Sequence, residues 1–150
     1  HSKDEIKESV FLNDMPEYSE ELTFGGMSDR WNKLFTLRDD VMKALELARA
    51  SKLIGKSLDA KVTIYVNNDE HKALLDSFAS DLATVFIVSG ATVTEGTAAE
   101  GAYTETESGI AVLVEKADGH KCDRCWTYST EGVHDEDGFI CERCRKILEE

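Results

Sequence analysis

The 150-residue sequence contains a single proline, Pro16, and no apolar run that approaches the roughly eighteen residues of a membrane span. No basic-then-apolar leader opens the chain. We therefore expect no membrane partner and a cytoplasmic location. Hydrophobic residues make up 41% of the chain and charged residues 31%, which favours a compact α+β fold over a disordered tail.

Motifs that carry common enzyme chemistry are also missing. The sequence has no glycine-rich loop of the kind that holds phosphates, and no G-x-S-x-G turn that would present a nucleophile. Carboxylates are plentiful, but none stands in an apolar setting of the kind that tunes a catalytic acid. We expect no catalytic site within this chain.

Positive charge is scarce and unevenly distributed. The formal net charge is -13, with 17 basic and 30 acidic side chains, which argues against a free-standing nucleic-acid binder. Residues 29–61 nevertheless carry 8 basic and 5 acidic side chains, whereas residues 62–115 carry 1 and 9. The cations of the basic segment are Arg30, Lys33, Arg38, Lys43, Arg49, Lys52, Lys56 and Lys61. Two interpretations stay open: a solvated helix face with intrahelical ion pairs, or a local surface that contacts anions.

Apolar residues recur at helical spacing in the basic segment. The pattern from Trp31 to Ala48 predicts a helix over 29–52, with Ser28 as its N-cap and Gly55 as its stop. Its apolar stripe is typical of a core-facing surface. Before this helix, residues 9–12 predict a strand or a buried extended segment that ends at Pro16.

The middle of the chain alternates between strand and helix patterns. Strands are predicted at 61–66, 84–88 and 110–114, with a further short strand at 91–94. A turn and N-cap at 67–69 lead into a helix that carries Leu74, Leu75, Phe78 and Leu82, and Gly90 predicts a turn. Residues 95–109 are small and acidic, which predicts an exposed loop.

All four cysteines lie in the last thirty residues, as Cys122-x2-Cys125, fifteen intervening residues, and Cys141-x2-Cys144. Each C-x2-C turn points two sulfurs to one side, so two facing turns supply four thiolates to one zinc ion. A closed four-sulfur shell leaves no position for water, so this zinc is expected to be structural. Residues 126–128 and 139–140 predict two short strands joined by a turn at Asp137-Gly138.

Other uses of the cysteines are less economical. Disulfides need an oxidising compartment, which nothing in the sequence indicates, and a redox-active C-x2-C does not explain two paired motifs. His120 and His134 lie near the cluster, but four cysteines complete the shell, so both are expected to be ordinary loop histidines.

The predicted architecture has three parts. Residues 1–27 form an extended lead-in, residues 28–115 an α+β domain, and residues 116–150 a zinc ribbon. The fold class is α+β, with a long N-terminal helix, a small mixed sheet with a packed helix, and the C-terminal four-cysteine ribbon.

Several blocks of the sequence resemble the C-terminal region of bacterial isoleucyl-tRNA synthetases. They are residues 8–16 (ESVFLNDMP), 31–38 (WNKLFTLR), 44–49 (ALELAR), 52–62 (KLIGKSLDAKV), 119–126 (GHKCDRCW) and 141–144 (CERC). The zinc spacing alone is generic, whereas the helix block combined with K-C-x-R-C-W is specific to this family.

The resemblance implies a parent that is a class I synthetase, joining isoleucine to tRNA with ATP in catalytic domains upstream. This tail would pack on an upstream helical anticodon-binding domain in cis and help to hold the anticodon arm of tRNA. Its terminal zinc would support tRNA binding and take no part in the chemistry. The acidic segment 62–115 would repel RNA, so we expect the basic helix and the zinc module to make the contacts with tRNA.

Candidate tRNA contacts follow from that expectation: Lys121, Arg124, Trp126, Arg143, Arg38, Arg49, Lys52 and Lys56. Trp126 would either pack as a plug on the ribbon or stack on a base, alone or with Tyr128. Arg124 and Arg143 would either contact phosphate or neutralise the thiolates. The competing functions are a zinc-ribbon adapter for protein interactions, which the acidic surface suggests, and a thiol redox sensor.

Overall fold

A computed structural model of the chain describes residues 8–14, 17–136 and 138–149. The elements follow in the order α1 Gly25–Ala50, β1 Ala60–Val66, α2 Asp69–Asp76, α3 Leu82–Phe86, β2 Gly90–Glu95 and β3 Ala111–Lys116, then β4 His120–Lys121, β5 Tyr128–Ser129, β6 Gly132–Asp135, β7 Gly138–Cys141 and α4 Glu142–Leu148. Short 3-10 turns occupy Val10–Leu12, Glu20–Leu22 and Ser57–Asp59. The α+β class is confirmed.

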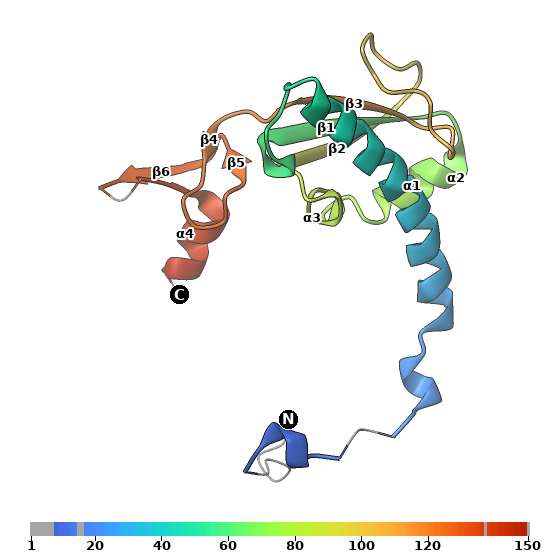
Figure 1. Cartoon of the computed structure of the whole chain (residues 1–150), viewed down its shortest axis with the longest axis vertical. Helices are drawn as coiled ribbons and strands as arrows, with labels where there is room; N and C mark the ends of the chain where they lie inside the picture. The colour runs from blue at the N-terminus through green and yellow to red at the C-terminus, as the bar shows by residue number, and fades with distance from the viewer. Residues whose placement is uncertain (1–7, 15–16, 137, 150) are drawn as a thin grey trace.

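A three-stranded mixed sheet forms the centre of the body, in the order β2-β1-β3. β1 pairs in parallel with β2 and antiparallel with β3. Burial alternates along β1, so one face of the sheet carries the core. The helices cover that face, and α2 and α3 lie in the crossover between the parallel strands (Figure 1).

Helix α1 packs on the core from Trp31 to Ala48, and its N-terminal end projects away from the body (Figure 1). Its fully buried apolar residues are Leu34, Leu37, Val41, Ala44, Leu45 and Ala48, at the helical spacing that the sequence predicted. The helix is 26 residues long, yet among the described residues no helix is apolar enough over a sufficient length to cross a membrane.

The ends of α1 differ from the prediction. The helix begins at Gly25 after Phe24, so Ser28 lies inside the first turns and is not the N-cap. It ends at Ala50, because Lys52 takes a left-handed conformation with φ 62 and Leu53 N–H donates to Ala48 O at 2.9 Å. Gly55 lies beyond this stop, where its N–H donates to Asp59.

The predicted strand at 84–88 is wrong. Residues Leu82–Phe86 form helix α3, because Leu82 and Phe86, four apart, are both fully buried, which is a helical spacing. The parallel partner of β1 is β2, and Gly90 begins that strand instead of forming a turn. The expectations for strands at 61–66, 91–94 and 110–114 are confirmed by β1, β2 and β3.

The N-terminal lead-in also departs from expectation. Residues Val10–Leu12 form a 3-10 turn, and Phe11 is 93% exposed, so neither a strand nor a buried segment is present there. The expected end of this segment at Pro16 lies outside the described residues. By contrast, Asn68 is the predicted N-cap of α2, since its Oδ1 accepts the His71 N–H at 2.7 Å.

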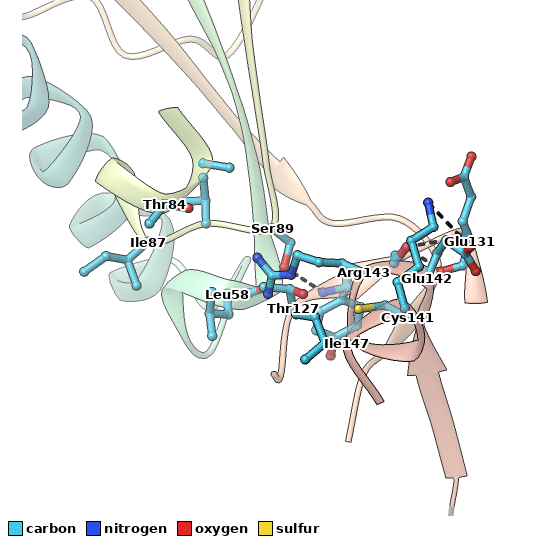
Figure 2. Close-up of a pocket in the computed structure, with 15 residues that line it drawn as sticks. Leu58, Thr84, Ile87, Ser89, Thr127, Glu131, Cys141, Glu142, Arg143 and Ile147 are labelled. Atoms are coloured by element: carbon cyan, nitrogen blue, oxygen red, sulfur yellow. Dashed lines mark hydrogen bonds and ion pairs between the residues drawn. The ribbon is translucent and has the colours of Figure 1, made fainter. Parts of the chain in front are cut away.

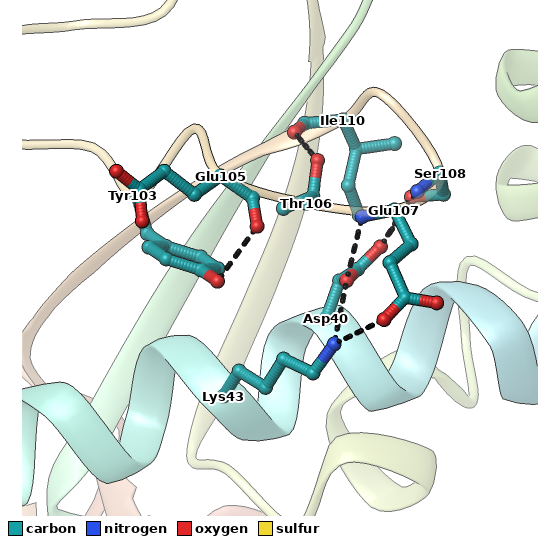
Figure 3. A network of polar contacts seen from close by, with 8 residues as sticks. All are labelled: Asp40, Lys43, Tyr103, Glu105, Thr106, Glu107, Ser108 and Ile110. Carbon is teal, nitrogen blue, oxygen red and sulfur yellow. Dashed lines mark hydrogen bonds and ion pairs between the residues drawn. The ribbon is translucent and has the colours of Figure 1, made fainter.

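The acidic loop between β2 and β3 is fixed to α1 by one buried carboxylate (Figure 3). Asp40 is 1% exposed and accepts hydrogen bonds from the Glu107 N–H, the Ser108 N–H and the Ser108 hydroxyl, at 3.1, 3.0 and 2.6 Å. Burial raises the pKa of Asp40, but these hydrogen bonds outweigh it and hold the pKa below its ordinary value.

The zinc module leaves the sheet at the end opposite that loop. β3 ends at Lys116 beside Ala60, the first residue of β1, whereas β2 ends at Glu95 beside Val66. The loop, with four glutamates and no basic residue over 95–109, therefore lies at the Val66 end. The end of α1 and the zinc module share the Ala60 end.

Candidate metal centre and basic surface

Four cysteine side chains converge in the C-terminal module. Cys122 and Cys125 lie between β4 and β5, Cys141 ends β7, and Cys144 belongs to the first turn of α4. The four Sγ atoms all lie within 4.8 Å of one another, and those of Cys125 and Cys141 are 3.7 Å apart. A tetrahedral shell with Zn–S bonds of about 2.3 Å needs sulfurs about 3.8 Å apart. The cluster therefore fits one zinc ion with all four cysteines as ligands.

The buried interior of the module consists largely of those ligands. Cys122, Cys141, Cys144 and Phe139 are buried, with only Cys125 and Ile140 packed against them. So small an apolar core cannot stabilise a fold by itself, so the metal–thiolate bonds act as its core. Zinc bound here supplies structural support and, with no open coordination position, no hydrolytic chemistry.

Asp123 links the two cysteine turns. Its Oδ2 accepts the Phe139 N–H at 2.9 Å, and its own N–H donates to Phe139 O at 2.9 Å. Gly138 has φ 128, and a Cβ there would lie 2.2 Å from Asp123 Oδ2, so only glycine fits. The sequence analysis missed Asp123 and assigned Gly138 to a turn with Asp137, which lies outside the described residues.

The strand pairing within the module also differs from expectation. Residues Gly138–Cys141 do form a strand, β7, but its partner is β6, and β5 pairs instead with β4. Gly119 permits the β4–β5 contact, because it has φ 86 and a Cβ there would lie 2.2 Å from Ser129 O.

The metal-free thiols differ in acidity. Burial raises the pKa of Cys125, but hydrogen bonds from the Thr127 hydroxyl and backbone N–H outweigh it and lower the pKa to about 6. Burial raises the pKa of Cys141 to about 12. Zinc binds thiolates, so loading the site must displace the protons that the thiols carry.

Arg124 and Arg143, which each precede the second cysteine of a C-x2-C turn, have different surroundings. A hydrogen bond to the Cys125 thiolate, together with its negative charge, raises the pKa of Arg143. Arg124 is exposed. Arg143 thus lies where it can neutralise a ligand sulfur, whereas Arg124 faces solvent.

Trp126 is 61% exposed and is not part of the module core, so the plug interpretation is wrong. The Nζ of Lys121 lies 5.9 Å from the Trp126 ring centroid, which brings two of the predicted contact residues together on the surface.

The two nearby histidines lie outside the four-cysteine group. His120 and His134 lie in β4 and β6, not in loops, with ring centroids 4.8 Å apart and both rings beside Phe139. The metal-ligand group found among the described residues contains cysteines alone.

The cations of the basic segment fall into two sets. The paired cations, Lys33, Lys43 and Lys61, lie 2.6, 2.9 and 2.8 Å from Glu70, Glu107 and Asp118. These bridges reach other elements, so within the described residues the expectation of intrahelical pairs is met only by the 3.9 Å contact of Lys43 with Asp40.

The remaining predicted contact residues of this segment have no carboxylate partner within the described residues. Arg38 Nε donates to Val85 O at 2.9 Å, which joins α1 to α3, and Arg49 donates to Ser57 Oγ at 3.0 Å. Lys52 and Lys56 follow the end of α1 and make no ion pair in the part of the chain that the structure describes.

A cavity of about 780 Å³ separates the body from the zinc module (Figure 2). Thr84 and Ile87 line it from the end of α3, and Arg143 and Ile147 line it from α4. At its base the Tyr128 N–H donates to Ser89 Oγ at 2.7 Å, and the Ser89 hydroxyl donates to Leu58 O at 2.6 Å. This relay attaches the module to the body.

Comparison with known proteins supports the zinc assignment and shows which proteins the chain resembles. Residues 119–147 match the family described as a zinc finger found in FPG and IleRS. The whole chain is 41% identical, over 163 aligned positions, to isoleucine–tRNA ligases of Bacillus mycoides, Bacillus cytotoxicus and Bacillus anthracis. It spans 17% of the length of these relatives. The chain is therefore similar, over its entire length, to the C-terminal region of bacterial isoleucyl-tRNA synthetases.

Proposed function

We propose that this chain is the non-catalytic, tRNA-binding C-terminal part of an isoleucine–tRNA ligase. The parent would join isoleucine to its tRNA with ATP in domains upstream, in the cytoplasm, where thiolates stay reduced and available to zinc. The observation that carries the proposal is the four-cysteine centre in a chain 41% identical throughout to such ligases.

The topology supports this role despite the net charge of -13. RNA binding needs clustered cations, and the net charge matters less than where the charges lie. The sheet places the acidic loop at the Val66 end and the zinc module beside the basic end of α1 at the Ala60 end. Lys121, Arg124 and Trp126 of the module are exposed, as contacts to phosphate and base would require.

The same proposal includes a partner in cis. Large apolar side chains before and at the start of α1 are exposed: Phe11, Leu12, Tyr18, Leu22, Phe24 and Met27. Such a concentration is typical of a contact surface. We propose that it packs on the upstream helical anticodon-binding domain.

The test neutralises the module cations in the full-length ligase, as Lys121→Gln, Arg124→Gln and Arg143→Gln together. Affinity for tRNA should fall, and the slope of log affinity against log salt should become shallower by about 0.7–0.9 for each lost phosphate contact. The matched control changes the paired cations Lys33, Lys43 and Lys61 to Gln, which removes the same charge from ion pairs.

Because Arg143 contacts a ligand thiolate, zinc content is measured in each variant, and the Lys121→Gln/Arg124→Gln pair tests the proposal without that change. An unchanged affinity and slope in the zinc-loaded pair would contradict tRNA binding by the module and favour the protein-interaction adapter.

A further inference from the structure

A second cavity, of about 590 Å³, lies at the C-terminal end of α1. We name it the junction pocket. The residues that matter for its chemistry are Arg49, Lys52, Asp59, Lys116 and Tyr128. Four belong to the body, while Tyr128 comes from β5 of the zinc module. The pocket thus lies where the long helix, the sheet and the zinc module meet.

The pocket gathers an excess of positive charge in an acidic protein. Three cations line it, and none forms an ion pair within the described residues. Its one carboxylate, Asp59, already accepts the N–H groups of Gly55 and Lys56 at 3.2 and 2.7 Å. Although the sequence has 30 acidic and 17 basic side chains, three cations and one carboxylate line this cavity, and this local excess of positive charge favours an anion.

Capping of α1 does not explain these cations. Cations often stabilise the negative end of a helix by bonding its last carbonyls. Here the carbonyls of Leu47, Ala48 and Arg49 already accept backbone N–H groups from residues 51–53, at 2.9 to 3.0 Å. Lys52 moreover occupies the left-handed position that usually falls to glycine, although a lysine side chain is disfavoured there.

Arg49 is held in place without being neutralised. One terminal nitrogen of its guanidinium donates to Ser57 Oγ at 3.0 Å, and a hydroxyl carries no charge. The remaining N–H groups keep the planar fork that matches two oxygens of a phosphate. Flanking lysines add point charges, which phosphate also accepts.

We propose that the junction pocket binds a phosphate group, and, resting on the proposed function, that this is a backbone phosphate of the tRNA. Phosphate oxygens would meet Arg49, Lys52 and Lys116 from the body and lie beside Tyr128 of the zinc module. A phosphate bound there touches both parts of the chain, so the long helix and the zinc module grip the RNA as one surface.

The experiment has two arms that separate free phosphate from RNA. In the first, the zinc-loaded 150-residue chain is titrated with inorganic pyrophosphate, and the amide signals of Lys52, Gly55 and Ala117 are followed by NMR. In the second, tRNA affinity of the full-length ligase is measured over a salt series. Both arms compare the unchanged protein, the Arg49→Gln/Lys52→Gln/Lys116→Gln variant and the paired-cation variant, which carries the same charge change.

We expect pyrophosphate to shift the three amides saturably in the unchanged chain and the paired-cation variant, and to lose this effect in the pocket variant. The salt slope for tRNA should become shallower by about 0.7–0.9 in the pocket variant, relative to the paired-cation variant. If pyrophosphate shifted the amides but the pocket variant and the paired-cation variant had the same salt slope for tRNA, the occupant would not be an RNA phosphate. The pocket would then bind a free phosphate compound.

No amide shift, with tRNA slopes equal in the two variants, would overturn the phosphate site itself. If the Lys121→Gln/Arg124→Gln pair still weakened tRNA binding in that case, the proposed function would stand while this inference failed. If that pair and the pocket variant both left tRNA binding unchanged while pyrophosphate still bound, the proposed function would fail and the phosphate site would remain.

Discussion

At the scale of single residues, Asp40 is a buried charged side chain of the body. It is buried in α1 and holds the acidic loop through two backbone N–H groups and one hydroxyl (Figure 3). Hydrogen bonds to a buried carboxylate are stronger than neutral ones, and losing one partner leaves the others unsatisfied. The residue therefore couples the long helix to a loop nearly 70 positions away in the sequence.

We expect Asp40→Asn to lower the free energy of unfolding at pH 7 by about 2 kcal/mol. Because the folded pKa is lowered, the carboxylate stabilises fully above its unfolded pKa of about 3.9, and this contribution disappears as the pH falls through the folded value. Urea unfolding from pH 7 to pH 3 should thus show a constant difference from the unchanged chain down to about pH 5, and a shrinking one below about pH 4.

Asp39→Asn is the matched control, since Asp39 is the exposed neighbour on the same helix. A difference for Asp40→Asn that stayed the same at pH 3, or that Asp39→Asn reproduced, would contradict the role given to the buried carboxylate.

At the scale of elements, the zinc module and the sheet have separate cores. The body core is drawn from residues 34–112, whereas the module core contains the four ligands and two other apolar residues. Zinc binding by small finger peptides is worth about 10–16 kcal/mol, far more than so few apolar contacts contribute. Stability of the module should therefore follow the metal.

Cys141→Ser should abolish zinc binding and unfold residues 119–147 while the β1–β2 pair persists. The measurement combines metal analysis with NMR, in which the module amides move to unfolded positions and those of β1 do not. A chelator should do the same to the unchanged chain, reversibly on return of zinc. Loss of both sets of amides together would show that the module and the body fold as one unit.

Several elements could be foreseen from the sequence because their signals are local. The stripe of α1, the alternation of β1, the Asn68 cap and the C-x2-C spacing each depend on residues a few positions apart. The strand expected at 84–88 failed because β-branched residues fit both a strand and a short buried helix. The helix is favoured over the strand because it buries both Leu82 and Phe86 against the rest of the core.

The domain boundaries expected at residues 28 and 116 stay a prediction. β3 ends at Lys116, and the module then begins through Gly119 and β4. The tRNA contacts assigned to Arg38, Arg49, Lys52 and Lys56 likewise await the binding experiments. Sequence analysis passed over Lys116, because nothing near it in the chain indicates that it lies beside Arg49.

At the scale of the whole molecule, the N-terminal end of α1 and the segment before it project away from the body (Figure 1). Phe11 is 93% exposed, and the neighbouring large apolar residues are exposed too. If the chain is part of an isoleucine–tRNA ligase, as we propose, the upstream helical domain would cover these side chains.

We expect amide hydrogen exchange over residues 17–33 to be at least about tenfold slower in the full-length ligase than in the isolated chain, because packing restricts local opening. The amides of β1 serve as the internal control and should exchange alike in both. Equal exchange over 17–33 in the two proteins would contradict the proposed contact with the upstream domain.

The sequence by itself was enough to predict the four-cysteine group, the long helix and the resemblance to isoleucyl-tRNA synthetases, because ligand spacing, helical periodicity and sequence motifs depend on neighbouring residues. Only the tertiary structure decided which cations are neutralised and where the others gather. Charge pairing depends on distances across the fold: the sheet brings Lys33, Lys43 and Lys61 to carboxylates more than thirty positions away, and it leaves Arg49, Lys52 and Lys116 around one cavity beside the zinc module.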